Sequence, residues 1–202
     1  QSDSGAKGVE NITKGLGWST VTMPFDPAYA SSLDNPLRRK ALPPRRILSH
    51  IISLHVKRNV AVDVGAGAGY LTIPLSWVFK KVYAIEANPK MARILEGNLR
   101  GRGMENVEVL LAEKPPTLPM RPNLVAFSLS LHEISDREAY LEWARASDYV
   151  LVIEWMREKT RGPPVHERIS KEELLKLARG YELVLSRDYW PYYLIILKPK
   201  RI

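Results

Sequence analysis

The feature with the clearest chemistry is a glycine-rich turn that follows a short run of β-branched residues. Asp63 stands two residues before the first glycine, and the turn contains Gly65, Gly67 and Gly69. Glycines let the backbone approach a ligand closely, and the start of a following helix offers unpaired N–H groups. A strand, a turn and a helix in this order bind a nucleotide-like ligand at the carboxyl ends of parallel strands.

The spacing of the glycines indicates which ligand the turn accepts. The dinucleotide fingerprint is G-x-G-x-x-G, whose third glycine would fall on Tyr70, but this chain has Gly69 and reads G-x-G-x-G. The carboxylate of Asp63 would oppose a pyrophosphate, whereas it suits a cationic or zwitterionic ligand. S-adenosylmethionine carries an ammonium group and a sulfonium group and no phosphate, so the electrostatics favour it over NAD.

Two further acidic residues stand where the next two strands are expected to end. Glu86 ends the run Lys81–Glu86, and Glu113 follows the run Val107–Leu111. A carboxylate at the first position accepts hydrogen bonds from ribose hydroxyls, and one at the second could accept a hydrogen bond from the adenine amine. The sequence therefore predicts a cofactor site on one edge of a sheet. Its predicted members are Asp63, Gly65, Ala66, Gly67, Gly69, Tyr70, Glu86, Ala87, Glu113 and Ser128.

A histidine and a glutamate stand at the end of the expected fourth strand, at the same sheet edge as the predicted cofactor site. His132 and Glu133 follow the apolar stretch 123–131, which is typical of a buried parallel strand. Methyl transfer needs an aligned acceptor and, for some acceptors, a group that removes a proton. His132 and Glu133 are therefore the predicted catalytic residues, His132 as a base or acceptor-orienting group. The alternative is that His132 only stabilises its loop. Glu154 and Trp155 are expected to line the acceptor pocket.

The elements that must position these residues alternate between strand and helix. Pro43 and Pro44 open a helix, and Asn88 with Pro89 begins another. Strands are expected at 59–64, 81–86, 107–111, 123–131 and 149–154, a helix at 69–79, and two more helices after the capping boxes Ser135/Glu138 and Ser170/Glu173. Residues 181–187 and 192–197 follow as an antiparallel hairpin. This order predicts an α/β fold with a parallel sheet covered on both faces.

Residues 59–155 resemble the core of the class I S-adenosylmethionine-dependent methyltransferases. Asp63–Gly69 resembles the first motif of that family, Glu86 its ribose-binding acid and Glu113 its adenine-side acid. The resemblance implies a Rossmann-like three-layer sandwich, with a seven-stranded sheet in the order 3-2-1-4-5-7-6 and strand 7 antiparallel. Ala68 departs from the commoner Thr or Ser, Glu113 departs from the commoner Asp, and the usual Pro-Gly before strand five is missing.

Several flanking segments are similar to the small prokaryotic members of the ubiquinone/menaquinone-biosynthesis-like branch. They are residues 25–27, 33–36, 38–39, 128–133, 153–155, 162–164 and 168–170. These segments are specific for a branch and not for a substrate. The resemblance implies S-adenosylmethionine as the cofactor and an unidentified small-molecule methyl acceptor, with apolar or quinone-like compounds among the candidates.

Composition sets further bounds. The 202 residues favour one domain, with 1–42 as a tail and lid and 43–202 as the methyltransferase domain. Cysteine is absent, which excludes disulfides, thiolate metal sites and a cysteine nucleophile. The four histidines lack metal-ligand spacing, so no metal is expected. No apolar run is long enough to span a membrane, and a cytoplasmic location is expected. The single glutamine suggests a thermophilic source.

The charge of the chain leaves alternative functions open. The net charge is +8, and the segment between Asp34 and Asp63 holds basic residues but no acidic one. An RNA or protein methyltransferase could use the basic stretch 38–58 to hold an acidic partner, although no stacking aromatics accompany it. A non-catalytic cofactor-binding module and an NAD-dependent reductase are further alternatives. Residues 22–42, with Phe25 and Leu33, are predicted to form the lid over the acceptor pocket.

Overall fold

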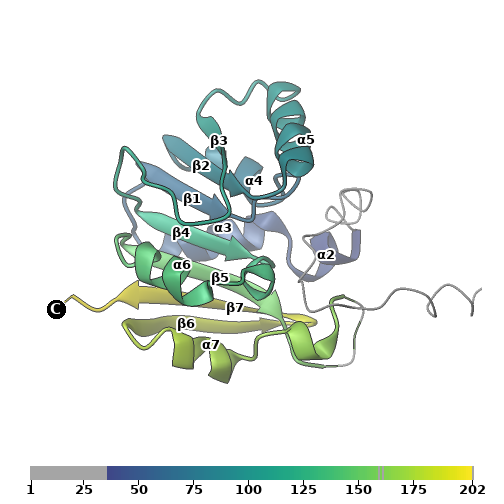
Figure 1. Ribbon diagram of the computed structural model, residues 1–202, viewed down its shortest axis with the longest axis vertical. Coiled ribbons are helices and arrows are strands. Elements are labelled where there is room, and N and C mark those ends of the chain that lie inside the picture. The colour runs from purple at the N-terminus through teal and green to yellow at the C-terminus, as the bar shows by residue number, and fades with distance from the viewer. Residues whose placement is uncertain (1–35, 159, 161, 202) are drawn as a thin grey trace, which may run out of the picture.

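Seven strands pair into one sheet in the order β3-β2-β1-β4-β5-β7-β6, as the computed structural model of the chain shows (Figure 1). The structure describes residues 36–158, 160 and 162–201. Neighbouring strands from β3 to β5 run parallel, and β7 is antiparallel to both β5 and β6. The predicted fold class is confirmed. The strands are β1 Val60–Val64, β2 Lys81–Glu86, β3 Val107–Leu111, β4 Leu124–Ser128, β5 Tyr149–Trp155, β6 Tyr181–Tyr189 and β7 Tyr192–Pro199.

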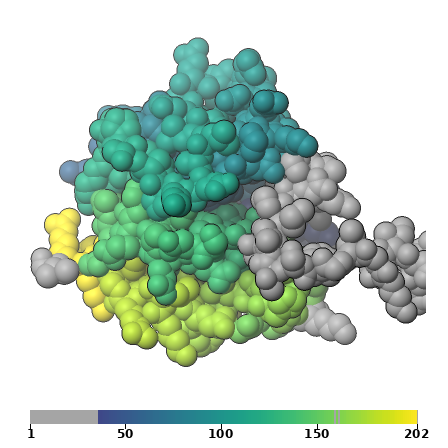
Figure 2. All heavy atoms as spheres, viewed as in Figure 1, coloured from purple at the N-terminus to yellow at the C-terminus, as the bar shows by residue number. Residues whose placement is uncertain are grey.

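Helices cover both faces of the sheet, because successive strand residues alternate between two apolar clusters. One face packs against α6 (Arg137–Ala144) and α7 (Lys171–Leu177), and the other packs against α3 (Pro44–Ser53) and α4 (Thr72–Ser76). A third cluster joins the second face to α5 (Pro89–Arg100). Figure 2 shows the α6 and α7 side as one continuous surface, with α6 in green and α7 in yellow-green. The short helix α2 (Pro36–Ala41) precedes α3.

Local sequence signals explain where these elements begin. The Asn88 side chain accepts hydrogen bonds from the N–H groups of Lys90 and Met91, and Pro89 takes the first position of α5, where its missing N–H costs nothing. Ser170 and Glu173 form the predicted capping box of α7. All five residues of β1 are buried, as expected for a central parallel strand. The predicted starts of α5 and α7 are confirmed.

Several predicted boundaries are wrong. The helix expected at 69–79 is only α4; Pro74 lies in its first turn and has no N–H to bond to the carbonyl of Tyr70, so the regular helix begins at Thr72 and not at Gly69. The strand expected at 123–131 ends at Ser128, because Leu129 takes a left-handed backbone conformation with φ +59°. The cap of α6 is Asp136, whose side chain accepts from the N–H of Ala139, and not Ser135. The hairpin strand β6 also extends two residues further than predicted, to Tyr189.

Residues 22–35 of the predicted lid lie outside the described residues, and α2 is its described end. The division of the chain at residue 42 therefore stays a prediction. Within the described part of the chain, no helix is long and apolar enough to cross a membrane.

Candidate active site

The glycine-rich turn connects the carboxyl end of β1 to α4. Gly65, Gly67 and Gly69 all have positive φ angles, of 70°, 55° and 98°, which side chains disfavour. The N–H groups of Gly65 and Ala66 both donate to the carbonyl of Ile85 on the neighbouring strand, at 2.9 and 3.1 Å. The turn is thereby fixed against the end of β2, where Glu86 stands.

Gly65 is required at its position for steric reasons as well. A Cβ atom added there would lie 2.4 Å from the Cβ of Ser130, whose hydroxyl donates to the carbonyl of Val64 at 2.6 Å. We expect Gly65→Ala to lower the free energy of unfolding by about 2 kcal/mol. Gly103→Ala is the matched control, because Gly103 has a similar φ of 62° but an added Cβ meets nothing within 4 Å. Urea titration should show a loss of about 1 kcal/mol for the control, and equal losses would contradict the steric argument.

Glu86 clamps the turn through its side chain. One carboxylate oxygen accepts from the N–H of Gly67 at 2.8 Å, and the other accepts from the N–H of Asn88 at 2.9 Å. The side chain is 9% exposed. Since a carboxylate has about four lone-pair positions, these two bonds leave acceptor capacity toward a ribose.

Asp63 is buried at the end of β1 and is only partly satisfied. Its Oδ2 atom accepts from the hydroxyl of Thr72 at 2.6 Å, and its Oδ1 atom has no hydrogen-bond partner among the described residues. Burial raises the pKa of Asp63 from 3.8 to about 6, although the bond from Thr72 and the charge of Arg38 oppose the rise. A buried carboxylate oxygen without a partner favours a cationic ligand and disfavours a phosphate. Asp63 and Glu86 therefore fit S-adenosylmethionine, with its ammonium group and its ribose.

Arg38 extends from α2 to the same edge of the sheet. Its Nη2 atom donates to the hydroxyl of Ser128 at 2.9 Å, and its guanidinium carbon lies 3.7 Å from the centre of the Tyr70 ring. The Tyr70 hydroxyl in turn donates to the carbonyl of Leu42 at 2.7 Å. Ser128 and Tyr70, both predicted cofactor-site residues, thus lie beside the segment that precedes the sheet.

The remaining predicted cofactor residues differ in how the structure places them. Ala66 is buried and packs with Ala84 and Leu95 beneath the turn. Ala87 is exposed, between Glu86 and Asn88. Glu113 is also exposed, two residues beyond the end of β3. Its role toward adenine stays a prediction.

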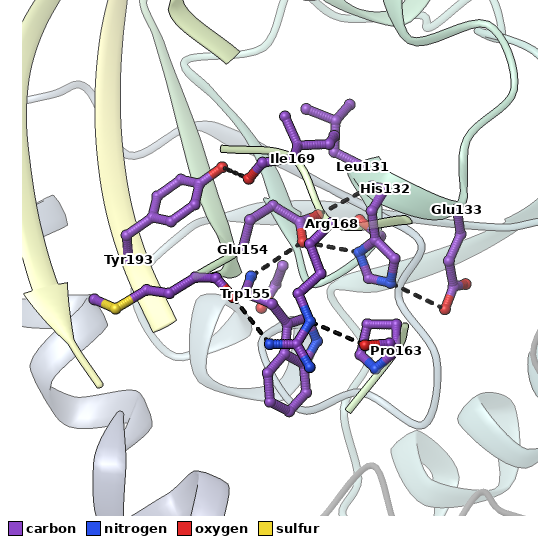
Figure 3. A network of polar contacts seen from close by, with 12 residues as sticks. Leu131, His132, Glu133, Glu154, Trp155, Pro163, Arg168, Ile169 and Tyr193 are labelled. Atoms are coloured by element: carbon purple, nitrogen blue, oxygen red, sulfur yellow. Dashed lines mark hydrogen bonds and ion pairs between the residues drawn. The ribbon is translucent and has the colours of Figure 1, made fainter. Parts of the chain in front are cut away.

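His132 forms a buried pair with Glu154 at the ends of β4 and β5 (Figure 3). The Nδ1 atom of His132 lies 2.8 Å from Oε2 of Glu154, and the backbone N–H of His132 donates to Oε1 at 3.1 Å. Glu154 is fully buried, so its charge is balanced by these contacts and by the Trp155 N–H at 3.3 Å. The carboxylate holds the imidazole by one ring nitrogen, and Nε2 lies toward Glu133 at 3.6 Å.

The charge state of His132 is set by two opposing effects. Burial lowers its pKa, but the hydrogen bond to Glu154 and the charges of Glu154 and Glu133 outweigh burial, so the pKa lies above the ordinary 6.5. His132 is thus held as a cation over a wider pH range than a free imidazole. The structure places His132 beside Glu133 and beside Glu154, which orients its ring, and the catalytic role of His132 and Glu133 stays a prediction.

Arg168 organises the loop that follows β5, a role that was not predicted, although residues 168–170 resemble a segment of the family branch. Its guanidinium donates to the carbonyls of Pro163, Met156 and Glu158 at 2.7 to 2.9 Å, and it lies over the Trp155 ring at 5.2 Å (Figure 3). The side chain is 2% exposed. Because β5 ends with Glu154 and Trp155, Arg168 fixes the chain directly beside the His132–Glu154 pair.

No protein-family model matches the chain. The probable cobalt-precorrin-6B C(15)-methyltransferase (decarboxylating) of Methanothermobacter thermautotrophicus is 38% identical over 69 residues, which cover 34% of this chain and 36% of that enzyme. Protein-L-isoaspartate O-methyltransferase 2 of Nitrosococcus oceani is 40% identical over 55 residues, 27% of this chain and 25% of that enzyme. The chain thus matches about a third or less of the length of these two curated relatives.

A solved structure matches over a much longer range. The S-adenosylmethionine-dependent methyltransferase from Aquifex aeolicus superposes with a TM-score of 0.76 and 26% identity, covering 88% of this chain and all of that one. By fold and by sequence, the chain is similar to the class I S-adenosylmethionine-dependent methyltransferases.

Proposed function

We propose that the chain transfers the methyl group of S-adenosylmethionine to a small-molecule acceptor. The observation that carries the proposal is the buried, half-satisfied carboxylate of Asp63 at the end of β1, directly before the glycine turn. A phosphate would be repelled there, whereas an ammonium group would supply the missing partner. Glu86, on the adjacent strand, accepts the ribose hydroxyls.

Different residues of the chain bind the cofactor and position the acceptor. S-adenosylmethionine supplies an electrophilic methyl group when it is bound. The turn and Glu86 hold the adenosine part, and the ends of β4 and β5 face the acceptor. Glu154 fixes the imidazole of His132 through Nδ1, so that Nε2 is available to orient the acceptor or to accept its proton once His132 is neutral. Positioning of the acceptor supplies the rest of the rate enhancement.

A small-molecule acceptor is supported by two observations. One matching relative is named for methylation of a cobalt-precorrin, which is a small molecule. The second observation concerns the basic stretch 38–58, which an RNA methyltransferase would use to bind its substrate. This stretch does not form one continuous surface. Arg38 is buried at the site, and Ile47 and Ile51 are buried in the core.

Radiolabelled methyl transfer tests the proposal. The purified chain, incubated with labelled S-adenosylmethionine and fractionated cell lysate, should place label in the small-molecule or lipid fraction. His166→Ala serves as a control, because His166 is exposed. Label confined to protein would instead support a protein acceptor, as the name of the isoaspartate relative would suggest. Label confined to RNA would support the basic stretch as a docking surface.

A further inference from the structure

Arg38 is the feature that the proposed function leaves unexplained. Three of its neighbours on α2, Leu37, Arg39 and Lys40, are exposed, but Arg38 is 7% exposed. Burying a guanidinium is costly unless acceptors and charges compensate it. The side chain nevertheless extends inward to Ser128, a residue 90 positions away in the sequence.

The charge of Arg38 lies at the same sheet edge as that of Asp63. Arg38 meets β4 at Ser128, and Asp63 is at the end of β1, the strand that pairs with β4. Burial raises the pKa of Asp63, and the positive charge of Arg38 is among the effects that oppose this rise. Ser128 and Thr72 are the separate hydrogen-bond partners of the two groups. The cation of Arg38, which comes from α2, and the anion of Asp63, on β1, thus lie at one edge of the sheet, and each has a hydrogen-bond partner of its own.

Two opposite charges held in this way match a zwitterion. The amino-acid end of S-adenosylmethionine carries an ammonium group and a carboxylate on one carbon atom. A guanidinium is well suited to a carboxylate, because its N–H groups can donate two parallel hydrogen bonds. The Tyr70 ring, 3.7 Å from the guanidinium carbon, fixes the plane of that group.

We infer that Arg38 binds the α-carboxylate of the cofactor while Asp63 faces its ammonium group. The inference rests on the proposed function and extends it, since it makes α2 part of the cofactor site. Helix α2 then has to be in place for tight binding, and the segment before the sheet contributes to cofactor affinity as well as to any contact with the acceptor.

Calorimetry with two ligands that differ only in the carboxylate tests this inference. S-adenosylhomocysteine has the carboxylate, and S-adenosyl-3-thiopropylamine lacks it but keeps the amine. The unmodified protein should bind the amine about 30-fold more weakly. Arg38→Met replaces the guanidinium by an apolar side chain of similar length. It should weaken binding of S-adenosylhomocysteine by about the same factor and change the affinity for the amine by no more than about threefold. Arg39→Met, on the exposed side of α2, should change neither affinity.

The possible outcomes separate this inference from the proposed function. If Arg38→Met lost affinity equally for both ligands, or lost affinity for neither, the role of Arg38 would be overturned while the proposed function stayed intact. If a thermal melt showed that the variant is not folded, the affinities of the unmodified protein for the two ligands would still test whether the carboxylate is bound. Equal affinities there would overturn the inference. Binding of neither ligand to the unmodified protein would overturn the proposed function and this inference together.

Discussion

Asp63→Asn is expected to weaken binding of S-adenosylhomocysteine by about 100-fold and, at the same time, to stabilise the protein at neutral pH. The affinity falls because the neutral amide cannot balance the ammonium group. The stability rises because the carboxylate is fully buried with one oxygen unpartnered among the described residues. Burial raises the pKa of Asp63 from 3.8 to about 6, which corresponds to about 3 kcal/mol at neutral pH. The amide can still pair with Thr72, since a hydroxyl both donates and accepts.

The stabilisation should depend on pH in a defined direction. The pKa of Asp63 in the folded protein lies above its ordinary value, so the folded state binds this proton more tightly than the unfolded state does. The stabilisation that comes from protonation of Asp63 is therefore complete below about pH 4, and it is lost as the pH rises through about 6. The advantage of Asp63→Asn should be absent near pH 4 and full above about pH 7.

Chemical denaturation at several pH values, combined with calorimetry, checks both effects. Asp136→Asn is the matched control, because Asp136 is an exposed helix cap and asparagine caps equally well. A variant at Asp63 that loses stability and keeps its affinity would show that the carboxylate is structural.

Loss of the His132 imidazole is expected to reduce turnover by about 100-fold or more without weakening cofactor binding. His132→Ala removes the group that faces the acceptor, and the two side chains that contact its ring, Glu133 and Glu154, do not belong to the glycine turn. The measurement is methyl transfer with the acceptor found in the labelling experiment, together with the affinity for S-adenosylhomocysteine. Unchanged turnover would leave His132 with a structural role.

A second variant tests whether Glu154 acts through His132. Burial lowers the pKa of His132, and the bond to Glu154 with the charges of Glu154 and Glu133 raises it. Glu154→Gln removes the largest raising effects, so the pKa of His132 should fall below its value in the unmodified protein. Nuclear magnetic resonance titration of the imidazole would show the change, and the low-pH limb of the activity profile should move to lower pH with it. A profile that stays in place while the titration moves would separate His132 from the chemistry.

The sheet was predictable because its signals are local and repeated. Lys81–Glu86 and Val107–Leu111 have the predicted bounds, and Asn88 and Ser170 mark helix starts by hydrogen bonds within a few residues. The order of the strands was available only through the resemblance to a known family. The errors at Pro74 and Leu129 arose where one residue interrupts an otherwise regular pattern.

The site was predictable only in part, because much of it depends on contacts between distant segments. The turn and Glu86 lie within 25 residues of each other and share one motif. The contact of Arg38 with Ser128 spans 90 positions, and that of His132 with Glu154 spans 22. The burial and the role of Arg168 were not predicted, since a buried arginine that binds backbone carbonyls looks in the sequence like a surface residue. Polar residues that are buried by tertiary packing leave no periodic signal.

The most direct measurement of the site is a calorimetric comparison of two ligands on the purified chain. S-adenosylhomocysteine contains adenosine joined to a sulfur atom and carries no phosphate, whereas NAD carries a pyrophosphate. The buried carboxylate of Asp63 beside the glycine turn predicts tight binding of the first and no measurable binding of the second. Tight binding of NAD, with no heat of binding from S-adenosylhomocysteine, would contradict the assignment of this site to S-adenosylmethionine.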